Sequence, residues 1–307
     1  MVKRSDMGNH RGTWSMRWFL SVGWILIWTW GCGTSAYSAD EANQSRTCQT
    51  RGAQGDVLLI SVTFDGAPQH VKGTFLDRSV WFFPIASGRY AGLLGIDLQD
   101  DPGTYHLLVH ADYSDGPRRK SVCVTILKKD YPVQRLTLPK SMVELDQATL
   151  RRVRDEAQRV RQIFKHESPV RLWRGPFLEP VHGVISGRFG SRRIINGFPR
   201  SPHSGEDIAA PQGTPVVAMN SGVVRLTMNH FFTGNGVIID HGLGLFSMYF
   251  HLSDIFVREG QRIAKGEPIG TVGATGRATG PHLHWGIRLN GARVDPYSLL
   301  AIAFEKT

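Results

Sequence analysis

The chain has 307 residues, with 36 Lys and Arg against 26 Asp and Glu and a formal net charge of +10. Hydrophobic residues make up 41% and charged residues 20%, an ordinary globular composition that excludes wholesale disorder and a low-complexity fibre. The length allows two or three domains. No Lys/Arg block with interleaved aromatic residues occurs, so we expect no nucleic-acid partner.

Residues 1–39 have the pattern of a secretory signal peptide. Four basic residues precede an apolar run of twelve, Phe19–Trp30, and small residues follow it. As a helix, such a run rises only about 18 Å, too little to cross a hydrocarbon core of about 30 Å. We predict cleavage and export to the periplasm or cell envelope. An uncleaved interfacial anchor is the alternative, and lipidation of Cys32 is disfavoured because Trp30 fits a lipobox poorly.

Residues 40–130 are predicted to form an accessory domain. Turn signals rich in Gly, Pro and Asp separate short runs of β-branched and aromatic residues. The runs are Val57–Phe64, Val80–Pro84, Tyr105–Ala111 and Ser121–Leu127. This spacing is typical of a small Ig-like β-sandwich. A spacer or lid is the favoured role, and a module that binds the wall or a partner is the alternative.

Two cysteines, Cys48 and Cys123, remain once Cys32 leaves with the signal segment. Export would place them in an oxidising compartment, where a disulfide between them can persist. The alternative is a pair of small buried thiols. The sequence leaves both open.

Residues 131–180 are predicted to be a linker followed by an amphipathic helix. Asp146 is a suitable N-cap, and Ser168-Pro169 ends the helical run. Apolar residues recur at steps of three and four along one face: Leu150, Val153, Ala157, Val160 and Phe164. The opposite face is rich in arginine and could lie on an anionic polymer or membrane. We favour docking of the apolar face on the neighbouring domain.

Residues 181–307 are predicted to form an all-β domain, so the chain as a whole is mainly β. Glycine is dense there, helical periodicity is absent, and β-rich runs alternate with turns. Seven of the 12 histidines fall between residues 182 and 284. Grouped histidines are a stronger sign of chemistry than a lone one, so we expect the functional site in this domain.

Two histidine groups have spacings that suit a metal. The first is His203-Ser204-Gly205-Glu206-Asp207, in which a turn leads into a strand, and the second is His282-Leu283-His284. Side chains two apart on a strand point the same way, so both imidazoles of the second group would face one cleft. A catalytic zinc needs three protein ligands and one open position. His203, Asp207 and either His282 or His284 would supply them, and spacing does not choose between the pair.

Residues from about 183 to 300 resemble the catalytic domain of the LytM/lysostaphin-type zinc metallopeptidases, which cut the peptide cross-bridges of bacterial peptidoglycan. The resemblance covers about two fifths of the chain. It rests on motifs that agree in order and spacing: Gly187-Arg188-Phe189-Gly190, His203-x-Gly205-x-Asp207, Ala210-Pro211-x-Gly213-Thr214-Pro215, Tyr249-Phe250-His251-Leu252, Thr279-Gly280-Pro281-His282-Leu283-His284 and Val294-Asp295-Pro296.

The resemblance implies His203, Asp207 and His284 as ligands of one zinc ion per catalytic domain. It implies His251 and His282 as catalytic histidines that do not bind the metal. It also implies a fold of the duplicated-hybrid-motif type, with an open antiparallel sheet whose groove holds the zinc. Departures from the family pattern lie outside this ligand set.

The expected function is therefore a zinc-dependent endopeptidase acting on peptidoglycan, with D-alanyl–diaminopimelate links preferred over glycine bridges. The alternative is a non-catalytic scaffold that binds the wall and activates an amidase. A basic envelope protein with a structural zinc is disfavoured, because structural zinc sites are usually rich in cysteine. The expected partner is peptidoglycan. Membrane contact is expected only through the signal segment or a lipid anchor, and the oligomeric state is left open.

Overall fold

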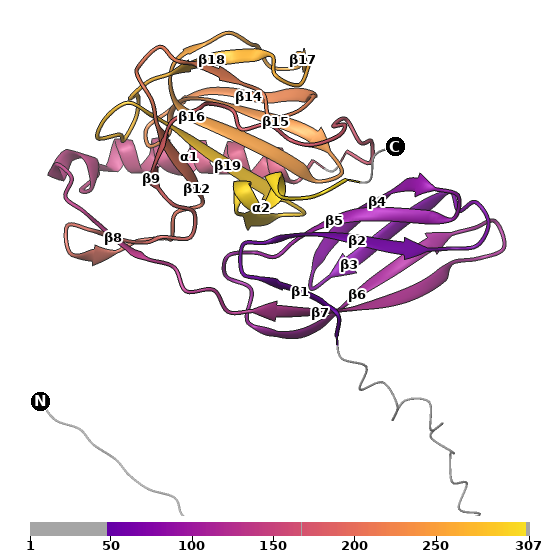
Figure 1. Ribbon diagram of the computed structural model, residues 1–307. Coiled ribbons are helices and arrows are strands. Elements are labelled where there is room, and N and C mark those ends of the chain that lie inside the picture. Colours follow the sequence, from indigo (N-terminus) through magenta and orange to yellow (C-terminus); the bar gives the residue numbers. More distant parts are fainter. Residues whose placement is uncertain (1–47, 167, 305–307) are drawn as a thin grey trace, which may run out of the picture. The chain divides into compact units, whose positions relative to one another are not determined.

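The structure is a computed structural model that describes residues 48–166 and 168–304 (Figure 1). The predicted signal peptide and Cys32 lie outside the described residues. Strands dominate, as predicted, and the helical elements are η1 (Lys140–Met142), α1 (Gln147–Phe164) and α2 (Pro296–Leu300). Among the described residues no helix is both long and apolar enough to cross a membrane.

The first seven strands form the predicted β-sandwich. They are β1 (Thr50–Ala53), β2 (Val57–Thr63), β3 (His70–Phe75), β4 (Arg78–Ala86), β5 (Arg89–Gly95), β6 (Gly103–Asp112) and β7 (Arg118–Leu127). Their order is β1-β7-β6-β3-β4-β5-β2, and β4 pairs with β3 and with β5, so it links the two layers. Only β1 and β7 are parallel within this set.

The predicted runs did not include β1, β3 and β5, because each of these strands contains glycine, which is rare in strands. At Gly73 a Cβ would lie 2.8 Å from the side chain of Leu107, so tight packing in the sandwich explains one of these glycines. The sandwich core is an apolar cluster that includes Ile60, Phe75, Val80, Leu107, Val109 and Val124. A Cys48–Cys123 disulfide is present and ties the start of the described chain to β7.

The second sheet, called the large sheet below, holds most of the C-terminal strands and is antiparallel throughout, as the family resemblance implied. Its main path is β17-β14-β15-β16-β19-β12-β9. The strands are β9 (Val184–Gly187), β12 (Gly205–Ala209), β13 (Pro215–Val217), β14 (Gly222–His230), β15 (Gly234–Gly242), β16 (Leu245–Ile255), β17 (Arg262–Ile263), β18 (Pro268–Val272), β19 (His282–Leu289) and β20 (Ala292–Val294).

The two faces of this sheet differ in character, and β19 shows it most clearly. Leu283, Trp285 and Ile287 are fully buried in an apolar core on one face. His282 and His284 alternate with them and therefore lie on the other face. The sheet thus has one face packed into a core and one face available for chemistry.

Part of the segment predicted as a linker is a strand, β8 (Val133–Leu136), which pairs in parallel with β10 (Arg192–Ile195). The strand β11 (Phe198–Pro199) completes this small sheet as a hairpin with β10. β8 lies about sixty residues before its partner in the sequence. The strand β8 has only four residues, too few for a sequence pattern that would reveal its pairing with a strand so distant in the chain.

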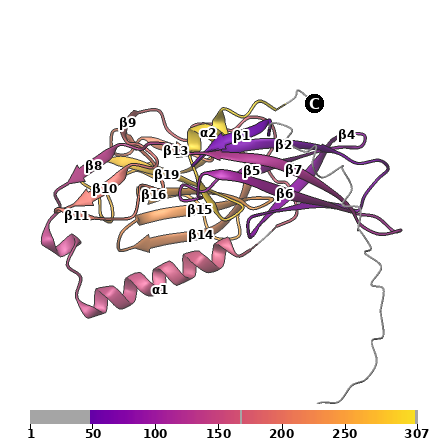
Figure 2. The same cartoon turned by 90° about the horizontal axis from the view of Figure 1, so that it is seen from below.

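Helix α1 docks on the polar-bearing face of the large sheet, as the sequence favoured. The Asp146 side chain accepts a hydrogen bond from the backbone N–H of Thr149 at 2.7 Å, which caps the helix at the predicted residue. Figure 2 shows α1 running beside β14. Val160, Ile163 and Phe164 pack against an apolar cluster from β14, β15 and β16. None of the helix residues is fully buried, so the helix covers this face only loosely.

The sandwich and the large sheet are joined by polar and apolar contacts. Asp97, just after β5, accepts two hydrogen bonds from the guanidinium of Arg293, at 2.5 and 3.0 Å, and one from its backbone N–H at 2.7 Å. The backbone N–H of Val57 donates to Ser298 Oγ at 2.8 Å. Phe83 packs edge-on against the buried Trp173, with ring centroids 5.2 Å apart.

Candidate metal centre

Three of the predicted site residues converge at the junction of β12 and β19. Asp207 and His284 are directly opposite in the antiparallel register. His203 lies just before β12, where its backbone N–H donates to Ser191 O at 2.9 Å. His203 Nε2 and His284 Nδ1 lie 2.9 and 2.8 Å from Asp207 Oδ1, and 2.9 Å from each other.

This triangle fits a metal ion. Ligands 2.0–2.1 Å from a tetrahedral zinc are about 3.3 Å apart, so the three atoms need to spread by only a few tenths of an ångström. Two glycines leave the space: a Cβ at Gly205 would lie 2.8 Å from His284 Nε2, and one at Gly187 would lie 2.5 Å from Asp207 Oδ2. Together with the His/Asp/His donor set, this makes the cluster suitable for a divalent metal.

The protonation of the ligand atoms also suits a metal. His203 Nδ1 lies 3.1 Å from the carbonyl oxygen of Arg188, which can only accept, so Nδ1 carries the proton and Nε2 presents its lone pair to the cluster. Burial lowers the pKa of His203 to about 4. Burial alone would raise the pKa of Asp207, but its close contacts with His203 and His284 outweigh burial and lower that pKa. A neutral imidazole and an ionised carboxylate are the forms that bind metals.

The second oxygen of Asp207 has a partner that the sequence analysis missed. Arg193 Nη2 lies 2.7 Å from Asp207 Oδ2, and Arg193 Nε donates to Gln134 Oε1 at 3.0 Å. Gln134 is on β8, and Arg193 is opposite it on β10. This chain of contacts orients the carboxylate so that Oδ1 faces the two imidazoles. No local pattern marks either residue, because only the β8–β10 pairing brings them to the site.

The other two predicted residues, His251 and His282, lie beside the triangle. Their ring centroids are 4.6 Å apart, and the His251 ring is 6.2 Å from that of His284. His251 Nδ1 lies 2.8 Å from Thr275 O, and His282 Nδ1 lies 2.9 Å from Gly280 O. Both rings therefore hold the proton on Nδ1 and leave a lone pair on Nε2.

Geometry separates His282 from His284, which the residue spacing did not. His284 Nδ1 is 2.8 Å from Asp207 Oδ1, whereas His282 Nε2 is 3.9 Å away. All five predicted site residues are thus brought into one cluster.

The backbone at His251 is bent to make this arrangement. Its φ is +64°, a left-handed conformation that is unusual for a residue other than glycine and costs free energy. In a regular strand Phe250 and His251 would face opposite sides. Here the Phe250 ring stacks on His284, with centroids 5.6 Å apart and planes 3° apart, while His251 also faces the cluster. Burial, with the nearby His284 and His282, lowers the pKa of His251 to about 3.

Comparisons with known proteins agree with this geometry. The model of peptidase family M23 matches residues 201–296, which include all five clustered residues. The chain is 46% identical over 112 residues to the peptidoglycan DD-endopeptidase ShyA of Vibrio cholerae, covering 36% of this chain and 26% of ShyA. It is 45% identical over 123 residues to the DD-carboxypeptidase/endopeptidase Mpg of Neisseria meningitidis, covering 40% of this chain and 28% of Mpg. The chain thus spans about a quarter of the length of these two relatives.

One solved structure matches far more of the chain. A structure described as a peptidase M23 from Pseudomonas aeruginosa is 31% identical, with a TM-score of 0.60, and the match covers 81% of this chain and 94% of that one. The likeness therefore extends beyond the residues of the family model to most of the described chain. On these grounds, the chain belongs to peptidase family M23.

Proposed function

We propose that this protein is a zinc-dependent endopeptidase that hydrolyses the peptide cross-bridges of bacterial peptidoglycan. The observation that carries the proposal is the convergence of His203, Asp207 and His284 within 2.9 Å of one another, with His251 and His282 alongside. One zinc ion per catalytic domain is the expected cofactor, since a His/Asp/His set leaves a fourth position free for substrate.

The proposed ligand atoms are His203 Nε2, Asp207 Oδ1 and His284 Nδ1. A zinc ion held there would act as a Lewis acid that polarises the scissile carbonyl. Arg193 holds the other carboxylate oxygen of Asp207 at 2.7 Å and keeps the ligand oxygen directed inward. Arg193 is therefore a positioning residue.

The proposed proton carriers are His251 and His282. Each ring is fixed through Nδ1 by a backbone carbonyl, so Nε2 points to a constant place in the groove. The lowered pKa of His251 keeps that ring neutral at pH 7, the form that accepts a proton. Peptide hydrolysis needs one proton taken from the attacking water and one given to the leaving amine. Two adjacent imidazoles can share these transfers.

The names of the relatives support the finer assignment of substrate. One is a peptidoglycan DD-endopeptidase and the other a DD-carboxypeptidase/endopeptidase. We therefore propose the D-alanyl–diaminopimelate link as the scissile bond. Export by the signal segment at residues 1–39 and a location in the periplasm or cell envelope form part of the same proposal.

A second candidate is a non-catalytic scaffold that binds the wall and activates an amidase. Such a role needs no metal ligands and no neighbouring pair of imidazoles. The complete cluster favours catalysis.

Digestion of purified sacculi, with mass spectrometry of the products, tests both candidates. The zinc-loaded protein should convert cross-linked dimers to monomers whose stem peptides stay attached to the sugar. The His284→Ala variant and a chelated sample serve as controls and should leave dimers intact. Dimers that stay intact after digestion with the zinc-loaded native protein would contradict the proposed endopeptidase activity. Intact dimers, together with faster release of stem peptides by an added amidase than by the amidase alone, would support the scaffold.

A further inference from the structure

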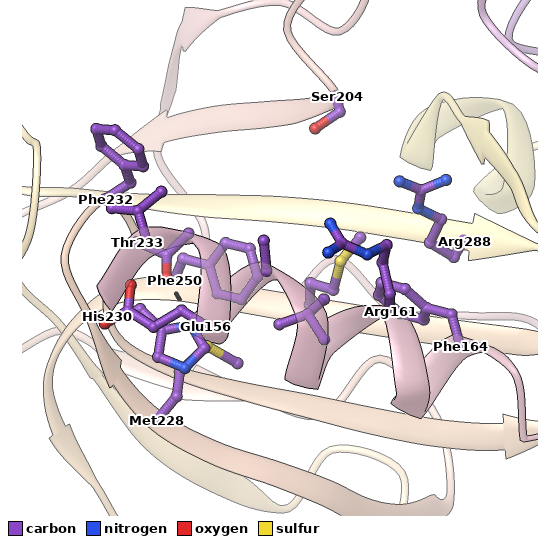
Figure 3. Close-up of a pocket in the computed structure, with 14 residues that line it drawn as sticks. Glu156, Arg161, Phe164, Ser204, Met228, His230, Phe232, Thr233, Phe250 and Arg288 are labelled. Atoms are coloured by element: carbon purple, nitrogen blue, oxygen red, sulfur yellow. Dashed lines mark hydrogen bonds between the residues drawn. The ribbon is translucent and has the colours of Figure 1, made fainter. Parts of the chain in front are cut away.

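A cavity of about 310 Å³ lies between α1 and the polar-bearing face of the large sheet (Figure 3). Its floor and wall are largely apolar, formed by Val153, Ala157, Val160, Met228, Met248 and Phe250. The helix that forms one wall is residues 147–164, outside the 201–296 matched by the family model. The cavity is therefore formed by the large sheet together with the neighbouring helix α1.

The cavity borders the cluster of His203, Asp207 and His284. Phe250 lines it and also stacks on His284. Ser204 lines it and is the residue that follows His203 in the chain. A peptide lying across the cluster along β19 would enter this space directly.

One end of the cavity carries two guanidinium groups, those of Arg161 on α1 and Arg288 on β19 (Figure 3). Arg288 Nη1 donates to Gly291 O at 3.0 Å, and its guanidinium lies 5.3 Å from the ring centroid of Phe164. No carboxylate of the described chain forms an ion pair with either arginine. Burial lowers the pKa of Arg288, which reflects a charge that has lost part of its water.

The acid that lines the cavity, Glu156, does not serve these arginines. Its carboxylate accepts hydrogen bonds from the backbone N–H of Phe231 at 3.0 and 3.2 Å and from Arg152 Nε at 2.7 Å. The arginine end is thus a half-buried, positively charged site beside an apolar wall. Its chemistry is complementary to a carboxylate on an aliphatic chain.

We propose that this cavity is a substrate subsite in which Arg161 and Arg288 receive a carboxylate of an acidic stem peptide, so that α1 is a specificity element. The inference rests on the proposed function and assigns recognition of the substrate to this cavity. Arg288 is four residues from His284 on β19, so the carboxylate lies about 13 Å from the scissile bond at a rise of about 3.3 Å per residue.

Two synthetic cross-linked peptides test the subsite on the full, zinc-loaded chain. They differ only in a carboxylate or a carboxamide about 13 Å from the scissile bond. The native protein should have a KM about tenfold lower for the carboxylate peptide, the effect of one charge-assisted hydrogen bond. In Arg161→Glu that ratio should fall toward one, with the change in KM rather than kcat.

Arg154→Glu is the matched control. This substitution makes the same change of charge on the same helix, but Arg154 does not line the cavity. It should keep the tenfold ratio. Arg288→Gln is a second variant and should also lower the ratio. Because Arg288 is half-buried, its thermal unfolding is measured alongside, and the exposed Arg161 keeps the test valid if Arg288→Gln does not fold.

Equal KM values for the two peptides in the native protein would overturn the subsite and leave the proposed function standing. Absence of hydrolysis of both peptides would overturn the proposed function instead. Binding of the same peptides, labelled and measured by fluorescence anisotropy, then decides the subsite. A tighter Kd for the carboxylate peptide that Arg161→Glu abolishes supports it, and equal Kd values overturn it.

Discussion

The sandwich and the large sheet are both built from strands, but they differ in how many of their faces are buried. In the sandwich, strands of both layers contribute to one enclosed apolar cluster that includes Phe75, Leu107 and Val124. The large sheet buries Leu283 and Trp285 on one face, and its other face is only partly covered by α1. A sheet face that no second sheet covers has room for imidazoles and a carboxylate. Substitutions at the polar face of the large sheet should therefore reduce hydrolysis, whereas substitutions in the sandwich core should reduce stability.

The largest effect is expected at the three proposed ligands. His203→Ala, Asp207→Ala and His284→Ala should each lower bound zinc and abolish hydrolysis, because three protein ligands are the minimum of a catalytic zinc site. Elemental analysis and turnover measure the two effects. His106→Ala, an exposed histidine of the sandwich, should change neither. Full zinc occupancy in all three variants would refute the assignment.

The next largest effect is expected at His251. His251→Ala should keep the metal and reduce kcat by about 10²–10⁴-fold, the usual contribution of a general acid–base residue. His251→Asn should lose as much activity but be more stable than the alanine variant, because asparagine tolerates the φ of +64° better. Loss of zinc in both variants would instead make His251 part of the metal site.

A stability effect without a catalytic one is expected in the sandwich core. Phe75 is fully buried and packs edge-on against Tyr105, with ring centroids 6.1 Å apart. Phe75→Ala should lower the free energy of unfolding by about 3–5 kcal/mol. Leu108→Ala, on the same sheet and 50% exposed, is the control and should change it by less than about 0.5 kcal/mol. Urea unfolding measures both, and a fall in kcat of folded Phe75→Ala would show that the regions are coupled.

The smallest effect is expected where the two regions meet. Burial would raise the pKa of Asp97, but hydrogen bonds from Arg293 outweigh it and lower that pKa. The ion pair therefore contributes stability above the unfolded pKa of about 3.9 and loses it as the pH falls below that value. Asp97→Asn should lower the free energy of unfolding at pH 7 by about 1–3 kcal/mol.

Urea unfolding of the native protein and Asp97→Asn across a pH series measures this difference. The gap between them should narrow as the pH falls below about 4. A constant gap from pH 7 to pH 3 would assign the effect to packing rather than to the charge of Asp97.

Much of the architecture followed from the sequence because it depends on local pattern. Runs of β-branched residues between turn signals predicted the sandwich and an all-β C-terminal domain, and the family resemblance implied the open sheet of that domain. The three- and four-residue apolar steps predicted α1 with its cap at Asp146. The alternation of β19 predicted that His282 and His284 share a face. The short helix α2 was not predicted, since five residues carry no periodicity.

The ligand candidates could be predicted because each is a chemically distinctive residue in a spaced group. The spacing of the two histidine groups indicated His203, Asp207 and one of two histidines as candidate metal ligands, and the family resemblance implied His284. In the structure Asp207 Oδ1 is 1.1 Å closer to His284 Nδ1 than to His282 Nε2. Spacing alone could not show this, because the two histidines are equivalent on an ideal strand.

Only the tertiary structure decided how the site is held and what surrounds it. Arg193 reaches Asp207 because β8 pairs with a strand about sixty residues later. His251 faces the cluster because its backbone leaves the regular strand conformation. Arg161 and Arg288 share a cavity because α1 lies on the sheet. The contacts of Arg193, and the cavity shared by Arg161 and Arg288, join residues far apart in the chain, whereas His251 depends on a break in a strand. Local periodicity records neither kind of feature.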